Sequence, residues 1–178
     1  MLALTLSNLD ERTRGFMLKE LEEDNAAGKL YISSRLTASG KKDYPTILRE
    51  AIQNGTDTSL ASKLDVPGML VSTESKTSSK GRGFTSAVPK NAAETLAEGE
   101  FNRFYSRGLS RRAIEDKIPN LVIYRAKEVA VSRPDSEAKI GTLVPAQKLL
   151  EDLRTSNGVD PALGLPSGPN SGLSVELP

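Results

Sequence analysis

The sequence contains no cysteine, no histidine and no tryptophan. Without cysteine there is no disulfide bond, no thiolate nucleophile and no iron–sulfur cluster, and a structural zinc site loses its usual ligands. Without histidine the chain lacks the side chain most often used as a general base near neutral pH and the commonest ligand of transition metals. We therefore expect no catalytic, cofactor or metal site, since any chemistry would depend on Asp, Glu, Lys, Ser, Thr or Tyr.

Aromatic residues and long apolar runs are also scarce. Four Phe and four Tyr are the whole aromatic complement of 178 residues, so aliphatic side chains must provide most of the core. The chain opens with a short apolar run that has no basic leader, and no stretch approaches the roughly 20 apolar residues that a transmembrane helix needs. We expect a cytoplasmic protein, or one that belongs to a virus particle, with no membrane contact.

The remaining composition is enough for one folded domain. Hydrophobic residues make up 37% and charged residues 26% of the chain, and its length is that of a single domain. Strand propensity favours residues 29–32 and the Val- and Ile-rich residues 121–131. Apolar periodicity predicts helices at about residues 9–25, 45–54, 59–64, 91–117 and 145–155. Together these segments predict an α+β fold, a single compact domain in which a small sheet is packed by about four helices.

Two segments are expected to lie outside regular structure. Residues 72–83 read STESKTSSKGRG, a basic run without apolar side chains to bury, which predicts a flexible loop. Residues 156–178 are so rich in Pro and Gly that they favour neither a helix nor a central strand. We expect residues 1–155 to form the α+β body and residues 156–178 to form an extended tail, held by that body or by a neighbouring subunit.

Basic residues gather in the middle of the chain. Residues 76–112 contain eight basic and three acidic side chains, although the whole chain carries a net charge of only +1. In the expected helix 91–117 three arginines recur at every fourth residue, which places them on one stripe, with two phenylalanines facing the other way. The side chains that we expect to contact a partner are Arg103, Arg107, Arg111, Arg112, Lys76, Lys80, Arg82, Phe101 and Phe104.

Two interpretations of this arginine stripe compete. It can clamp phosphates together with the basic loop, as in a nucleic-acid-binding module. It can instead pair with nearby acidic side chains across a solvated helix face or a protein interface. The acidic candidates are Glu98, Glu100, Glu115 and Asp116. The low net charge favours the second interpretation, because dedicated nucleic-acid domains are usually far more basic.

The same helix contains two glycines that weaken it. Each of Gly99 and Gly108 costs about 1 kcal/mol relative to alanine in a helix interior. Their presence predicts that another element approaches the helix closely, either within the chain or between subunits.

One enzymatic pattern is present in an incomplete form. Arg35, then Ser72-Thr73, then Glu98 and Glu100 follow the order used by ADP-ribosyltransferases, in which an arginine, a Ser-containing strand and a glutamate pair hold NAD. Here the glutamates fall inside an expected helix and not beside a strand. An enzyme similar to ADP-ribosyltransferases is therefore a distant alternative.

The sequence as a whole favours a non-catalytic structural or assembly protein. Such a protein forms homo-oligomeric contacts or binds other structural subunits. A bacteriophage virion component, such as a capsid, connector or tail protein, is one member of this class. The main alternative is a nucleic-acid-binding module that uses the arginine-rich helix and the basic loop.

Overall fold

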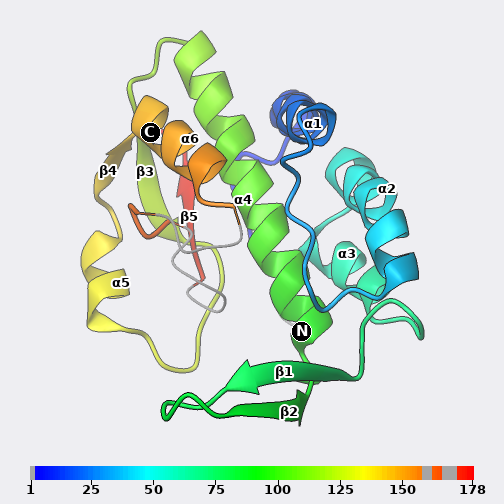
Figure 1. The fold of residues 1–178 in the computed structure, drawn as a ribbon. Coiled ribbons are helices and arrows are strands. Elements are labelled where there is room, and N and C mark those ends of the chain that lie inside the picture. Colours follow the sequence, from blue (N-terminus) through cyan, green and yellow to red (C-terminus); the bar gives the residue numbers. More distant parts are fainter. Residues whose placement is uncertain (1–2, 158–161, 166–171) are drawn as a thin grey trace.

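The computed structural model describes residues 3–157, 162–165 and 172–178. Within these ranges the elements are α1 (Glu11–Ala26), α2 (Ala38–Asn54), α3 (Asp57–Leu64), β1 (Thr73–Thr77), β2 (Gly83–Ala87), α4 (Ala92–Glu115), β3 (Asn120–Arg125), α5 (Pro134–Lys139), β4 (Leu143–Pro145), α6 (Ala146–Thr155) and β5 (Leu173–Glu176). They form one α+β unit with two small antiparallel sheets (Figure 1). The predicted fold class is therefore confirmed. No helix in the described ranges is long and apolar enough to cross a membrane.

Helix α4 runs through the centre of the molecule, with α1, α2 and α3 on one side and the three-stranded sheet on the other (Figure 1). It packs against α1, α3 and α6. Every residue from 101 to 110 is buried, so this part of the helix has no face toward solvent. The long helix expected at residues 91–117 is confirmed, but it lies in the interior of the protein.

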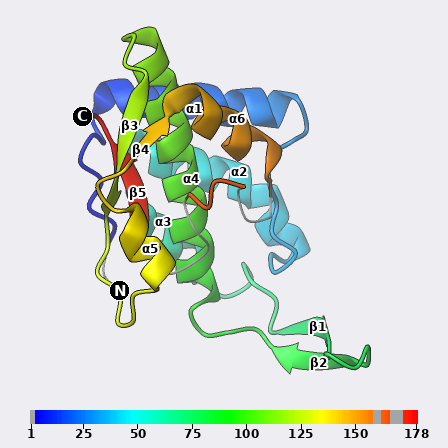
Figure 2. The same cartoon turned by 90° about the vertical axis from the view of Figure 1, so that its left-hand side faces the viewer.

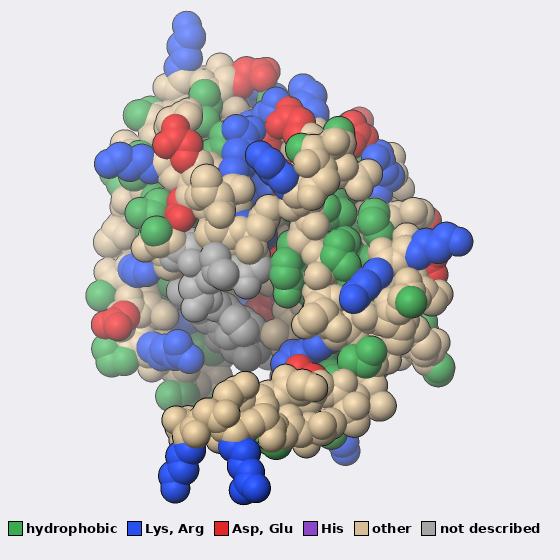
Figure 3. All heavy atoms as spheres, in the orientation of Figure 1, with side chains coloured by type: hydrophobic (Ala, Val, Ile, Leu, Met, Phe, Trp, Pro, Cys, Tyr) green, Lys and Arg blue, Asp and Glu red, His purple; other side chains and the backbone are tan. Residues whose placement is uncertain are grey.

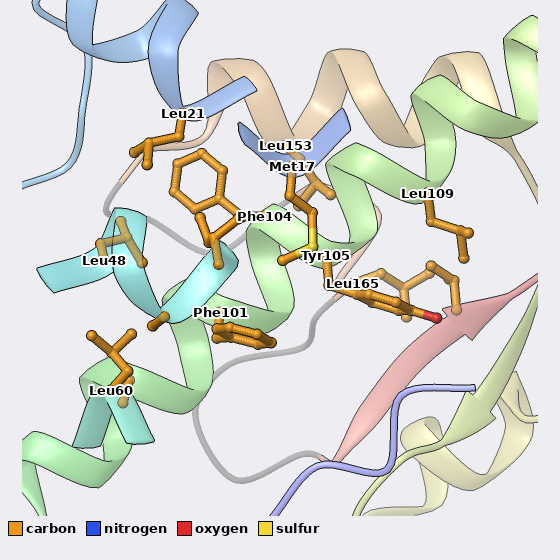
Figure 4. Close-up of a cluster of buried hydrophobic side chains, with 14 of the residues drawn as sticks. Met17, Leu21, Leu48, Leu60, Phe101, Phe104, Tyr105, Leu109, Leu153 and Leu165 are labelled. Carbon is orange, nitrogen blue, oxygen red and sulfur yellow. The ribbon is translucent and has the colours of Figure 1, made fainter. Parts of the chain in front are cut away.

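The core consists mainly of aliphatic side chains gathered around the aromatic residues of α4 (Figure 4). Phe101 and Phe104 are 0% and 1% exposed, and they lie among Leu21 of α1, Leu48 of α2 and Leu60 of α3. Burial of one such side chain contributes about 1.5–3 kcal/mol. These contacts fix the three N-terminal helices against one side of α4.

Helices α1 and α4 approach each other closely at Gly108. A Cβ atom at this position would lie 2.6 Å from Cγ and 2.8 Å from the backbone nitrogen of Met17, so only glycine fits. The expected close approach is confirmed for Gly108, and the approaching element belongs to the same chain. For Gly99 the structure shows no close approach within the described residues, because a Cβ atom there would meet none of them within 4 Å, and an approach between subunits stays a prediction.

The larger sheet has the strand order β4-β3-β5 and is antiparallel throughout. Its central strand β3 occupies the first half of the segment predicted to be extended, and it places Leu121 and Ile123 in the core. Val144 of β4 pairs with Leu121, and Val175 of β5 pairs with Ile123. The sheet therefore covers the side of α4 that the N-terminal helices leave open.

The end of the chain corrects the expectation of an extended tail. Residues 173–176 are the strand β5, in which Leu173 and Val175 are 0% and 1% exposed. Asn102 of α4 donates from Nδ2 to the carbonyl oxygen of Leu173 at 2.8 Å and accepts from Ser174 Oγ at 2.6 Å. The body of the same chain holds this segment, so it no longer supports contact with a neighbouring subunit. The rest of the predicted tail lies partly outside the described residues.

Other local expectations also change. Helix α2 begins at Ala38, because Thr37 accepts a hydrogen bond from the backbone N–H of Gly40 and caps the helix, and Pro45 lies inside it. Residues 29–32 pair with no strand in the part of the chain that the structure describes, so the strand predicted there is wrong. The flexible loop predicted at residues 72–83 is also wrong, since most of it belongs to the hairpin of β1 and β2.

Candidate interaction surfaces

Arg107 lies in the interior and is only 1% exposed. Its Nε donates to Glu20 Oε2 at 2.9 Å, and its terminal nitrogens donate to the two carboxylate oxygens of Asp24 at 2.6 and 2.8 Å. The guanidinium also lies 5.0 Å from the centre of the Phe104 ring. A buried arginine with this many partners is part of the core and is not free to bind phosphate.

The other arginines of the stripe are engaged as well. Arg111 donates to Glu20 and Glu23 of α1 at 2.9 and 2.7 Å, and Arg112 donates to Asp10 at the start of α1 at 2.7 Å. Arg103 turns the opposite way, toward the end of α6. It donates to the carbonyl oxygens of Leu153 and Ser156 and to Oδ1 of Asn157.

Glu20 is the centre of this network. Its side chain is fully buried, and it accepts hydrogen bonds from Arg107, Arg111 and Arg154, which belong to α4 and α6. Burial by itself raises the pKa of the carboxyl, but the hydrogen bonds and charges of Arg154 and Arg107 outweigh it and lower the pKa overall. Glu20 therefore stays ionised and joins three helices through charge-assisted hydrogen bonds.

The arginine stripe is therefore not an exposed interaction surface. Its carboxylate partners come mainly from α1. Of the four acidic candidates near it in the sequence, Asp116 alone pairs with an arginine of the stripe among the described residues, with Arg112 at 3.9 Å, whereas Glu98 pairs with Lys127 and Glu115 with Arg12. Phe101 and Phe104, expected at an interface, are core residues. The correction has a simple cause: α4 is covered on all sides in its middle turns, so its polar side chains pair internally.

The β1–β2 hairpin is the part of the molecule that stands away from the body (Figure 2). Its strands pair antiparallel over five residue pairs, from Thr73 opposite Ala87 to Thr77 opposite Gly83. No residue from 72 to 90 is buried. A two-stranded hairpin without a packed face is only marginally stable by itself.

One ion pair fixes the base of the hairpin to the body. Arg35 donates from Nε and Nη2 to the two carboxylate oxygens of Glu74 at 2.7 and 3.1 Å. Lys76 adds a third contact to Glu74 at 3.0 Å. Arg35 is thus turned toward the hairpin, while Glu98 lies in α4 beside Lys127, so the residues ordered as in ADP-ribosyltransferases do not form one group.

The free end of the hairpin is basic. Lys80 and Arg82 lie in and beside its turn, and among the described residues neither makes an ion pair. Figure 3 shows basic side chains that project from this end with no acidic side chain beside them. Of the basic loop predicted from the sequence, Lys76 is engaged with Glu74, and Lys80 and Arg82 remain exposed.

Several large apolar side chains are exposed, among them one on the hairpin and one at an edge of the larger sheet. Phe84 of β2 is 48% exposed, opposite Lys76 on the hairpin. Val131 and Leu143 are 84% and 60% exposed, and Leu143 lies on β4 at an edge of the larger sheet. Aromatic side chains such as that of Phe84 are enriched in the cores of protein interfaces.

Glu100, which the sequence placed among the acidic candidates beside the arginine stripe, lies in the interior. Glu100 of α4 is 8% exposed, and burial raises its pKa to about 7, while the charges of Arg103 and Arg107 act in the opposite direction. Tyr44 of α2 is fully buried, its hydroxyl has no hydrogen-bond partner among the described residues, and burial together with the charge of Glu100 raises its pKa.

Comparison with known proteins gives no further guide to these surfaces. No protein-family model, no curated protein and no solved structure matches the chain.

Proposed function

We propose that the protein is a non-catalytic assembly component that binds further copies of itself through the β1–β2 hairpin. The observation that carries this proposal is the hairpin itself, which projects from the body with both faces exposed (Figure 2). An element that buries no core surface gives little stability to its own chain. Packing against a neighbouring copy would give the hairpin the buried face that it lacks in a single chain.

The chemistry of the hairpin suits a protein partner. Both strands are edge strands, so each presents backbone N–H and C=O groups that can pair with an additional strand. Phe84 offers a large apolar side chain on the same element. On a second copy, the exposed Leu143 at an edge of the larger sheet supplies an apolar side chain beside an open strand edge. A bacteriophage virion is one assembly in which such an arm fits.

The test compares the intact chain with a variant that lacks the outer part of the hairpin. Two glycines replace residues 76–84 and close a two-residue turn between Ser75 and Thr85, which are paired in the intact hairpin. Glu74 and its contact with Arg35 are retained. Size-exclusion chromatography with light scattering is expected to show oligomers of the intact chain and monomers of the shortened one.

A matched control separates the arm from the stability of the fold. Phe84→Ser leaves the length of the hairpin unchanged and is expected to weaken association at least tenfold, with the same thermal midpoint as the parent chain. The intact protein remaining a monomer from micromolar to millimolar concentration would refute the proposal. Equal association of the intact and shortened chains would refute it as well.

The second candidate is a nucleic-acid-binding module, and the exposed basic end of the hairpin favours it. Lys76, Lys80 and Arg82 are the side chains that would contact phosphates. Neutralising three phosphates predicts that the logarithm of the binding constant falls with the logarithm of salt concentration with a slope of about −3. A variant with glutamine at all three positions should lose this dependence if nucleic acid is the partner, and should still self-associate if the hairpin is an assembly arm.

A further inference from the structure

Strand β2 has a backbone edge that is open to another strand. The N–H of Ser78 donates to the carbonyl oxygen of Arg82 at 2.8 Å, so β1 and β2 hydrogen-bond through their even-numbered residues. In an antiparallel ladder the residues between them direct their N–H and C=O groups to the other side. The outward residues of β2 are Gly83, Thr85 and Ala87. Within the described ranges no hydrogen bond reaches their backbone groups.

The other strand edges are less suited to pairing. On β4 the even-numbered residues bond to β3, so Pro145 faces outward, where it offers no N–H. On β5 the carbonyl oxygen of Leu173 is occupied by Asn102. Strand β1 lies on the side of the hairpin toward the body (Figures 1 and 2), and it carries the charged Glu74 and Lys76. Strand β2 reads GFTSA, so it lacks the charges and prolines that usually protect an exposed edge.

We propose that β2 pairs antiparallel with β2 of a second copy, in the register that places the two Phe84 side chains opposite each other. This inference rests on the proposed function and names the surface of the second copy that receives the hairpin. The pairing joins two hairpins into a four-stranded sheet with twofold symmetry. On each side of the centre, Gly83 of one copy lies opposite Thr85 of the other, which gives about four backbone hydrogen bonds.

The side chains of the hairpin favour this register. Glu74, Arg82, Phe84 and Ser86 lie on one face, because side chains alternate along each strand. In the proposed register Arg82 lies opposite Ser86 of the second copy, and Glu74 is the next residue beyond that small serine. The guanidinium reaches across Ser86 to the carboxylate, which has an acceptor position left beyond the three contacts within its own chain. Shifting one strand by two residues toward the base places Arg82 opposite Val88 and loses both this ion pair and the direct aromatic pair.

The experiment uses engineered cysteines, which report single contacts because the chain has none of its own. Full-length Arg82→Cys and Ser86→Cys chains are mixed under mild oxidation, and covalent dimer is measured by non-reducing electrophoresis. In the proposed register the two positions lie opposite each other with Cα atoms about 4.5 Å apart, within the range of a disulfide. In either chain alone the cysteines of two copies are four residues apart along the strands, about 13 Å. The mixture is expected to give at least tenfold more covalent dimer than either chain alone.

Arg82→Glu tests the ion pair of the same register. The new carboxylate faces Glu74 of the second copy, so association measured by light scattering should weaken at least tenfold. Lys80→Glu is the matched control, because it makes the same change of charge in the turn, beyond the paired residues, and should associate as the parent chain does. Both variants should keep the thermal midpoint of the parent chain, since neither position is buried.

The possible outcomes separate this inference from the proposed function. If the intact chain associates but the mixture gives no more covalent dimer than either chain alone, the pairing of β2 with β2 is overturned, and another edge of the second copy receives the hairpin. Equal weakening by Arg82→Glu and Lys80→Glu overturns the register. An intact chain that stays monomeric from micromolar to millimolar concentration overturns both the inference and the proposed function.

Discussion

The carboxyl of Glu100 makes the stability of the fold depend on pH near neutrality. Burial raises its pKa from 4.5 to about 7, because the loss of solvation outweighs the favourable charges of Arg103 and Arg107. Between these two values the folded chain keeps a proton that the unfolded chain has released. The free energy of unfolding therefore falls as the pH rises from about 4.5 to about 7, and this group lowers it no further at higher pH.

The size of the effect follows from the two pKa values. One pH unit between the folded and unfolded pKa corresponds to about 1.4 kcal/mol, so a change from 4.5 to about 7 corresponds to about 3 kcal/mol. That is a large part of the 5–15 kcal/mol that stabilises a typical domain. The chain has no histidine, so no imidazole titrates in the same range and obscures the result.

Glu100→Gln isolates this contribution, because glutamine resembles the protonated carboxyl at every pH. Urea unfolding followed by circular dichroism at pH 5, 6, 7 and 8 is expected to show similar stability of the two chains at pH 5. At pH 8 the variant should be more stable by about 3 kcal/mol. Glu98→Gln is the control, since it breaks the contact with Lys127 and should destabilise the fold at all four pH values. A difference between Glu100→Gln and the parent chain that stays constant with pH would refute the reasoning.

Three further predictions concern the packing around α4. Gly108→Ala should destabilise the protein by about 1–3 kcal/mol in urea unfolding, because the new methyl group collides with the Met17 backbone. At Gly99 the methyl group meets open space, so Gly99→Ala should stabilise the helix by up to about 1 kcal/mol. Arg107→Ala should cost about 3–5 kcal/mol in the same assay, because it leaves Asp24 without the arginine that it pairs with and removes one of the three arginines that bind the buried Glu20. Deletion of residues 173–178 should abolish cooperative thermal unfolding, because it removes a buried strand, and a sharp transition in the truncated chain would contradict the placement of β5 in the core.

The elements that could be predicted from the sequence are those determined by local signals. Apolar residues recur along α4, and Pro119 follows its end, so its length was predicted within two residues at each end. The run of Val and Ile in β3 likewise predicted a strand. Strand β5 has only four residues, among which Val175 is the single β-branched one, and it becomes a strand because β3 lies beside it. That contact joins segments about 50 residues apart, which no local pattern reveals.

The candidate interaction surface was predicted wrongly for the same reason, because its ion pairs join segments that lie far apart in the sequence. The neighbouring acidic residues Glu98, Glu100, Glu115 and Asp116 were the predicted partners of the arginines of α4, but the partners of Arg107 lie more than 80 residues away in α1. A signal was available in the spacing: Glu20 and Asp24 are four residues apart, as are Arg107 and Arg111. Two helices with complementary stripes of this kind are able to pair along their length. The burial of Tyr44 and Glu100 gave no comparable signal, because a buried polar group is recognised only after its neighbours are placed.

The basic excess of residues 76–112 therefore does not form one basic surface in the folded protein. Four of its eight basic residues are arginines of α4, and in the structure they join α1 and α6 to the central helix. What remains for a partner is mainly the hairpin, where Lys80 and Arg82 are exposed and Phe84 supplies apolar surface. Two unpaired charges give little electrostatic affinity by themselves, whereas an open strand edge with an aromatic side chain offers directional hydrogen bonds and buried area. This balance favours a protein partner over nucleic acid as the occupant of the hairpin.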